Sequence, residues 1–235
     1  MDTRYGWAGK ILKVDLSEKK ITTVETAEYA ERFIGGMGIG EKFYWDESTP
    51  AMPADDPQSP LLFMTGPLAA TPAPSAPRLV ICGKSPALYP EAFNSASIAG
   101  SFTAELKMAG YDGIVVTGKA SQPLYLTISS EAAELKDAAH LWGLTNSKTR
   151  QLIRETWGEK TRCLTIGPGA ESGSRIGTIA TDAGGNGSTG FGSLMGWKQL
   201  KAIAVRGSGK IAVADPEKIN AIRKAVREMA AGALE

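Results

Sequence analysis

Glycine dominates the stretch 180–201, where it recurs at positions 184, 185, 187, 190, 192 and 196. Because glycine has no Cβ and readily adopts positive φ, such a run can bring several backbone N–H groups against one ligand, at the start of a helix. This arrangement favours the binding of an anionic cofactor. A tightly packed turn would show the same composition, and the stretch has neither Walker spacing nor a G-x-G-x-x-G after a strand. The glycines alone leave both interpretations open.

Few side chains have the spacing of catalytic groups. His140 is the single histidine and has no cysteine or carboxylate at catalytic spacing, so we interpret it as a turn residue. Serines 95, 97 and 101 lie near glycines, but no G-x-S-x-G elbow is present, and we exclude a serine hydrolase. Capping or solvation accounts for two carboxylates that flank one predicted helix, Glu105 and Asp112. We predict no catalytic residue in this chain.

The two cysteines, Cys82 and Cys163, each lie in an apolar run typical of a strand. Buried free thiols are therefore favoured over a disulfide. Two isolated cysteines cannot supply the four ligands of a structural metal site. We predict no metal-binding residue in the chain.

Composition excludes several classes of partner. With 235 residues and 43% apolar content the chain can bury a sizeable core. The net charge of +1 gives no electrostatic reason to expect nucleic acid or an anionic membrane as a partner. No apolar run approaches the roughly 18 residues that cross a bilayer, and the charged start lacks a secretion signal. We therefore expect a cytoplasmic protein.

Hydrophobic patterns predict alternating strands and helices. A β-hairpin is expected over 10–25, and short helices over 27–33 and 41–45. Further helices are expected over 101–109 and 146–157, with a last one beginning at Asp215-Pro216, an N-cap followed by proline. Small residues dominate 92–100. Further strands are predicted over 61–65, 78–83, 113–118, 124–128, 164–166, 175–179 and 202–205.

The chain contains an internal repeat. Residues 63–67 (FMTGP) resemble 164–168 (LTIGP), and an arginine follows each at a predicted strand start, Arg78 and Arg175. Residues 107–119 likewise parallel 198–207, each behind a glycine-rich segment and a short helix. The repeat predicts two similar halves about a pseudo-twofold axis. The segments 94–100 and 184–192 would then be symmetry mates that line one surface, with ligand-free packing of two sheets as the alternative.

Seven motifs are spread along the chain. They are 9–17 (GKILKVDLS), 33–40 (FIGGMGIG), 65–68 (TGPL), 104–112 (AELKMAGYD), 137–143 (DAAHLWG), 166–171 (IGPGAE) and 192–205 (GSLMGWKQLKAIAV). In order and spacing they resemble the N-terminal domain of the aldehyde:ferredoxin oxidoreductase family, tungsten enzymes with relatives in benzoyl-CoA reductase, and the resemblance covers essentially the whole chain. It implies an α+β domain with a duplicated sheet-plus-helix motif and two mainly antiparallel sheets, which form a base for a bis-pyranopterin cofactor of tungsten or molybdenum.

The resemblance also implies cofactor-binding residues. Arg78 falls where the family has an arginine beside the cofactor, and a guanidinium there would meet phosphate or carbonyl oxygens. Ser97 replaces an asparagine that helps to hold the magnesium ion between the two pterin phosphates, and Gly185 falls where a backbone carbonyl does the same. The remaining candidates are Gly100, Gly184, Asn186, Gly187 and Ser188.

The glycine-rich stretch departs from the family pattern. Relatives usually carry arginines where this chain has Gly184 and Ser188. Backbone N–H groups could still bind phosphate, with less positive charge to neutralise it. Either this member has an altered cofactor environment, or the correspondence shifts by a residue or two near Asn186.

By resemblance, residues 1–212 form the cofactor base, with repeats of roughly 10–125 and 126–212. Residues 213–235 begin a helical domain, and Leu234–Glu235 looks like a cloning remnant. The family oxidises aldehydes to acids and passes electrons through a 4Fe-4S cluster to ferredoxin, so a fragment without the later helical domains would be inactive. The expected partners are an aldehyde, ferredoxin, those helical domains and, as a further option, a second copy. A natural short subunit without catalytic activity is the alternative.

Overall fold

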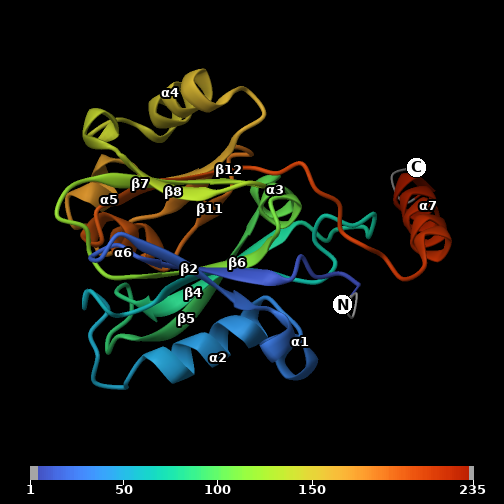
Figure 1. The fold of residues 1–235 in the computed structure, drawn as a ribbon, viewed down its shortest axis with the longest axis horizontal. Helices are drawn as coiled ribbons and strands as arrows, with labels where there is room; N and C mark the ends of the chain where they lie inside the picture. The colour runs from blue at the N-terminus through green and yellow to red at the C-terminus, as the bar shows by residue number, and fades with distance from the viewer. Residues whose placement is uncertain (1–4, 233–235) are drawn as a thin grey trace.

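Two mixed sheets of six strands form the framework of the protein (Figure 1). The computed structural model describes residues 5–232, so the expected cloning remnant Leu234–Glu235 lies outside the described residues. The first sheet has the strand order β2 (Lys20–Glu25), β1 (Lys10–Asp15), β6 (Tyr111–Thr117), β3 (Leu61–Thr65), β4 (Arg78–Ser85) and β5 (Ala92–Ala99).

The second sheet repeats this order with later segments of the chain. Its strands are β8 (Ala133–Asp137), β7 (Leu124–Ser129), β12 (Leu200–Arg206), β9 (Arg162–Thr165), β10 (Ile179–Thr181) and β11 (Asn186–Gly187). Each sheet has one parallel pair, β1 with β6 and β7 with β12, and its other pairs are antiparallel. The duplicated α+β fold predicted from the sequence is confirmed.

Helices lie between the sheets and on their outer faces (Figure 1). The central core contains residues of α3 and α6 together with the facing sides of both sheets. The outer face of the first sheet packs against α1 and α2, and that of the second sheet packs against α4. The helices are α1 (Ala27–Phe33), α2 (Met37–Glu47), α3 (Phe102–Met108), α4 (Asn146–Trp157), α5 (Pro168–Glu171), α6 (Phe191–Trp197) and α7 (Pro216–Gly232), with the 3-10 helix η1 (Ala139–Leu141).

The strands are apolar on both faces because both faces are covered. In β3, Leu61 and Phe63 enter the central core, whereas Leu62 and Met64 enter the cluster beneath α2. This alternation is the two-residue period of a strand. α7 differs from the other helices because none of its residues is buried, and it stands apart from both sheets (Figure 1).

Three sequence predictions about the elements are corrected. The small-residue segment expected to meet its symmetry mate as a loop forms β5, paired with β4 along its whole length. The strand predicted over 175–179 is wrong, since β10 begins at Ile179 and Arg175 lies in the loop before it. α2 begins at Met37 rather than at 41 because its glycines let it pack closely: a Cβ on Gly40 would lie 2.5 Å from Cys82 Sγ.

Equivalent β-bulges mark the two halves. The pairing of β6 with β1 shifts at Asp112, and the pairing of β12 with β7 shifts at Lys201. Lys201 is therefore the structural counterpart of Asp112. The equivalence drawn from the sequence between Lys107 and Lys198 is wrong by two positions. Among residues 5–232, no helix is long and apolar enough to cross a membrane.

Candidate functional site

The edge strands β5 and β11 bring the two halves together. Ser97 pairs with Val80 of β4, and Asn186 pairs with Ala180 of β10, so Ser97 and Asn186 are equivalent positions. A Cβ on Gly187 would lie 3.5 Å from Ile98 of β5, which shows how closely the edges approach. Segments 94–100 and 184–192 are therefore symmetry mates that meet in space, as the repeat predicts.

Arg78 and Ser97 form one side of this region. Arg78 begins β4, and its Nη1 donates hydrogen bonds to Ser97 O at 3.3 Å and to Ser97 Oγ at 3.5 Å. Both side chains are exposed. Among the described residues, no ion pair joins Arg78 to a carboxylate. The guanidinium is thus held at the sheet edge with its charge available to an anion.

The turn 181–185 forms the other side, and Thr181 closes it. Thr181 N donates to Gly185 O at 2.9 Å, and Gly185 N donates to Thr181 Oγ1 at 3.1 Å. The Thr181 hydroxyl also lies 3.4 Å from Ala99 O, across the junction of the halves. We did not predict Thr181 from the sequence; the only signal was a threonine one residue before Asp182-Ala183-Gly184.

Packing accounts for most of the glycines. A Cβ on Gly192 would lie 2.4 Å from Thr178 O, and one on Gly190 would lie 2.4 Å from Arg175 O. A Cβ on Gly185 would lie 3.1 Å from Ala99 O. Gly184 differs, since its φ is +76° and nothing lies within 4 Å of its Cβ position. Within the run 184–196, Gly184 alone combines a positive φ with an open Cβ position, so the alternative of sheet packing explains much of the run.

The remaining candidate residues are placed around this turn. Gly100 follows β5, and its Cβ position lies 3.5 Å from Thr181 Oγ1. Asn186 and Ser188 are exposed, whereas Gly187 is buried against Ile81 and Ile98. Seven of the eight predicted residues therefore lie along the two meeting edges, and Arg78 of the neighbouring strand β4 reaches them through its hydrogen bonds to Ser97. Their hydroxyl, amide, backbone and guanidinium groups suit a ligand that carries phosphate and carbonyl oxygens, with Arg78 as the single cation of the set.

Two arginines approach the turn from α4 but are already paired. Arg154 Nη2 donates to Asp182 Oδ1 at 2.6 Å, and Arg150 Nε lies 3.7 Å from the same oxygen. Asp182 Oδ2 accepts from Cys163 N at 2.8 Å. The Asp182 carboxylate therefore fixes the start of the turn. It also neutralises positive charge of Arg154 and Arg150 that could otherwise attract an anion.

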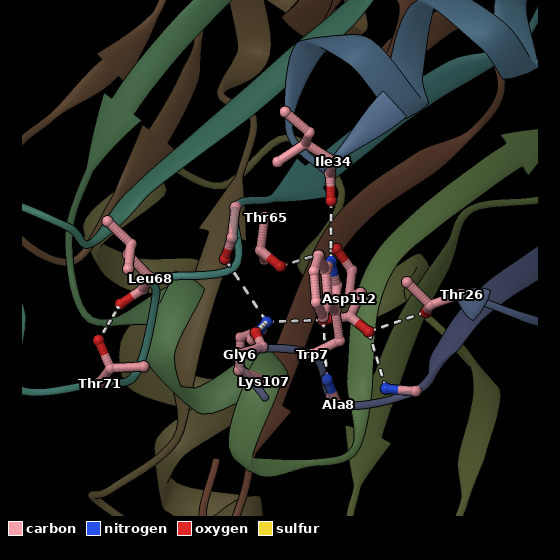
Figure 2. A network of polar contacts seen from close by, with 12 residues as sticks. Gly6, Trp7, Ala8, Thr26, Ile34, Thr65, Leu68, Thr71, Lys107 and Asp112 are labelled. Atoms are coloured by element: carbon pink, nitrogen blue, oxygen red, sulfur yellow. Dashed lines mark hydrogen bonds and ion pairs between the residues drawn. The ribbon is translucent and has the colours of Figure 1, made fainter. Parts of the chain in front are cut away.

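A buried ion pair lies at the start of β6, in the middle of the first sheet (Figure 2). Lys107 Nζ donates to Asp112 Oδ1 at 2.6 Å, and both side chains are almost fully buried. The carboxylate also accepts from Ala8 N at 2.9 Å, Gly9 N at 2.8 Å and Thr26 Oγ1 at 2.8 Å. Burial lowers the pKa of Lys107, and the charge of Asp112 opposes that shift. The prediction that solvation or capping explains Asp112 is wrong, because the residue anchors the N-terminal segment.

Other candidate reactive residues have structural roles. His140 is exposed in η1, consistent with a turn residue. Cys82 and Cys163 are free and buried, and burial raises the pKa of each thiol to about 12. Within the described part of the chain, no group of three or more histidine, cysteine, aspartate or glutamate side chains could hold a metal ion.

Comparison with known protein families identifies the family of this chain. Residues 11–207 match the family described as aldehyde ferredoxin oxidoreductase, N-terminal domain. The chain belongs to this family. It is 39% identical over 233 residues to the tungsten-containing aldehyde ferredoxin oxidoreductase of Pyrococcus horikoshii, a match that covers 96% of this chain and 37% of that protein. The tungsten-containing aldehyde ferredoxin oxidoreductase of Pyrococcus furiosus is 39% identical over 219 residues, a match that covers 91% of this chain and 36% of that protein.

Two further matches to this chain of the aldehyde ferredoxin oxidoreductase family have other names. An aliphatic sulfonate oxidoreductase, WOR-like subunit, of Pyrococcus furiosus is 34% identical over 244 residues, covering 93% of this chain and 37% of that protein. The active site complex BamBC of benzoyl coenzyme A reductase, in complex with 1,5 dienoyl-CoA, contains a similar chain. That chain superposes with a TM-score of 0.91 at 32% identity, covering 96% of this chain and 34% of its own length. The present chain thus spans little more than a third of the relatives it matches.

Proposed function

We propose that this chain is the base on which a tungsten pterin cofactor rests in an oxidoreductase of the aldehyde ferredoxin oxidoreductase family. The observation that carries the proposal is the junction of β5 and β11. There Arg78 and Ser97 of one half adjoin the Thr181–Gly185 turn of the other. A cofactor with two similar pterin halves suits two similar edges related by a pseudo-twofold axis.

Each candidate residue has a role in this proposal. Arg78 would neutralise a phosphate or bind a carbonyl oxygen. The N–H groups of Gly184 and Gly185 already donate to Thr181, so the exposed backbone at Ala183 would contact a second anionic group. Ser97 Oγ and Gly185 O would lie near a magnesium ion between the two phosphates. The other proposed contacts are Gly100, Asn186, Gly187 and Ser188. The bound group would supply two-electron redox chemistry, with tungsten or molybdenum as its metal.

The complete enzyme needs parts that this chain does not provide. We propose that it oxidises an aldehyde to the acid and passes two electrons through a 4Fe-4S cluster to ferredoxin, in the cytoplasm. The cluster would be held by helical domains of the same protein. Residues 1–212 would be the base, with repeats of roughly 10–125 and 126–212, and residues from 213 onward would begin the first helical domain. The isolated chain would be inactive; a homodimer is the proposed assembly.

Metal analysis and pterin fluorescence of the full-length protein test the proposal. We expect tungsten or molybdenum together with pterin, and a several-fold lower content of both in Arg78→Gln. Lys119→Gln, which removes an exposed charge at the far end of β6, is the matched control. A folded full-length protein that contains neither metal would overturn the proposal.

A non-catalytic subunit that retains the fold is the second candidate. It is favoured by the close packing at Gly185, Gly187, Gly190 and Gly192, which explains these glycines without a ligand. If this second proposal holds, the protein purified with its natural partners will contain no pterin bound to this chain. Arg78→Gln will then change neither the assembly of that complex nor the activity of the partner subunits.

A further inference from the structure

A cavity separates α7 from the loop that leads to Arg78. It measures about 490 Å³, and the loop 70–77 forms one wall. Arg223, Val226, Arg227 and Ala230 of α7 form the opposite wall. Because Pro77 precedes Arg78, and Ala104 of the lining follows Gly100 by four residues, the cavity adjoins the candidate cofactor site.

The residues that line this cavity carry positive charge. Arg223 and Arg227 are four residues apart, so their guanidinium groups project from the same face of the helix. The lining contains no acidic residue, and neither arginine forms an ion pair within the described part of the chain. The acidic Glu228 instead pairs with Lys224 at 3.9 Å, away from the cavity lining.

The loop wall adds polar donors on a stiff backbone. Prolines at 72, 74 and 77 fix φ at three of its eight positions. Within residues 5–232, the backbone N–H groups of Ser75 and Ala76 donate to no backbone acceptor. Ser75 is exposed and is one of the residues that line the cavity. Two guanidinium groups opposite such donors match the several oxygens of a phosphate.

We propose that Arg223 and Arg227, with the loop 70–77, bind a phosphate or diphosphate group of a small molecule. This site lies beyond the eight residues of the proposed cofactor site, in which Arg78 is the single cation. If the phosphate belongs to the pterin cofactor, the assignment rests on the proposed function, and α7 then supplies positive charge that the 184–188 segment lacks. A free phosphorylated compound is the other source of the same group.

Titration of the 235-residue chain with pyrophosphate at low ionic strength tests the site. The variants are Arg223→Gln/Arg227→Gln, Lys224→Gln and Arg78→Gln. Lys224→Gln is the matched control because it removes a positive charge from α7 outside the cavity. We expect the double variant to weaken pyrophosphate binding about tenfold or more, through lost charge-assisted hydrogen bonds. Lys224→Gln should change the affinity less than twofold.

The fold should survive the two α7 changes, Arg223→Gln/Arg227→Gln and Lys224→Gln, because no residue of α7 is buried. Equal midpoints of thermal unfolding for these variants and wild type will check this. Equal affinities of wild type and double variant would overturn the inference, as would an equal loss in Lys224→Gln. Loss in Arg78→Gln alone would also overturn it, while leaving the proposed function intact. In the full-length protein, lower pterin content in the double variant would support the site with the cofactor as its ligand. Unchanged pterin content with weakened pyrophosphate binding would support it with a free phosphorylated compound.

Discussion

Asp112 and Lys201 occupy equivalent β-bulges in the two halves but carry opposite charges. Asp112 pairs with Lys107 of α3, and Lys201 pairs with Glu171 of α5. Both ammonium groups also donate to a backbone carbonyl at the end of the central strand, Lys107 to Gly66 O at 3.5 Å and Lys201 to Ile166 O at 2.8 Å. Each half therefore has one buried ion pair at this point. In the first half the bulge carries the acidic residue and the helix the lysine, whereas in the second half the bulge carries the lysine and the helix the acidic residue.

Unequal destabilisation is expected when either partner of the Asp112 pair is removed. Asp112→Leu deprives Lys107, Ala8 N and Gly9 N of their acceptor and leaves a buried ammonium, at a cost of about 3–5 kcal/mol. Lys107→Met leaves the carboxylate with three remaining donors, so we expect roughly half that loss. Urea unfolding monitored by tryptophan fluorescence measures both.

Lys136→Gln provides the control, since its ion pair with Glu134 is exposed and should contribute less than about 1 kcal/mol. Equal losses for Asp112→Leu and Lys107→Met would contradict the asymmetry.

Lys198 should make stability depend on pH above neutrality. Burial lowers its pKa from 10.5 to about 7, although Asp56 and Asp15 oppose the shift. Between pH 7 and 10.5 the unfolded chain holds a proton on Lys198 that the folded protein lacks. Stability from this group therefore rises with pH across that window, by at most about 1.4 kcal/mol per pH unit. Below pH 7 both states are protonated, and the full cost of burying the charge applies.

Comparison of wild type with Lys198→Met isolates this effect. The variant loses the donor to Pro57 O at 2.7 Å and Gly118 O at 3.2 Å, which adds an offset independent of pH. The stability of wild type relative to the variant should increase from pH 7 to 10. The exposed neighbour Lys119→Gln should show no such trend, and a constant difference for Lys198→Met would refute the prediction.

The fold was predictable where strands are apolar on both faces and recur in the second half. Runs such as 61–65 and 113–118 carry that signal. β5 was not assigned as a strand because Asn94, Ser95 and Ser97 have little strand preference, and its pairing with β4 maintains it. The strand placed over 175–179 failed because Gly177 packs into a turn, where a Cβ would lie 2.8 Å from Ala170 Cβ.

The site was predictable only in part, for a related reason. The repeat identified both edges, since their motifs are local in sequence. The contact of Thr181 with Ala99 joins residues 82 positions apart, and Asp112 is buried by a segment more than 100 positions away. Local patterns contain neither relationship, so Asp112 was interpreted as solvated and Thr181 was missed.

Thr181→Val should loosen the turn that carries Gly184 and Gly185. Valine keeps the shape but removes the hydroxyl that accepts from Gly185 N, at a cost of about 1–2 kcal/mol. Hydrogen exchange should accelerate at the Gly185 amide while β12 stays protected. Thr181→Ser should restore protection, and the exposed Thr156→Val serves as control. Unchanged exchange at Gly185 in Thr181→Val would contradict this role.

Cys82 and Cys163 should react with a thiol reagent only when the protein opens. Both side chains are fully buried and burial raises the pKa of each thiol to about 12, so almost no thiolate forms near neutral pH. We expect labelling at pH 8 to follow the rate of opening, and to become rapid in denaturant. Fast labelling of either native thiol would contradict the packing around it.

Alanine at Gly192 and at Gly184 should separate packing from ligand binding. At Gly192 the new Cβ would lie 2.4 Å from Thr178 O, a backbone atom that cannot move aside, so we expect severe destabilisation. At Gly184 the space is open, and only the φ of +76° opposes alanine, which costs about 1 kcal/mol. Thermal unfolding of both variants measures this difference. In the full-length protein, Gly184→Ala should lower pterin content beyond what its small stability loss explains, because the altered turn would displace the backbone of the proposed cofactor site. Full pterin content in a folded Gly184→Ala protein would assign the glycine run to packing alone.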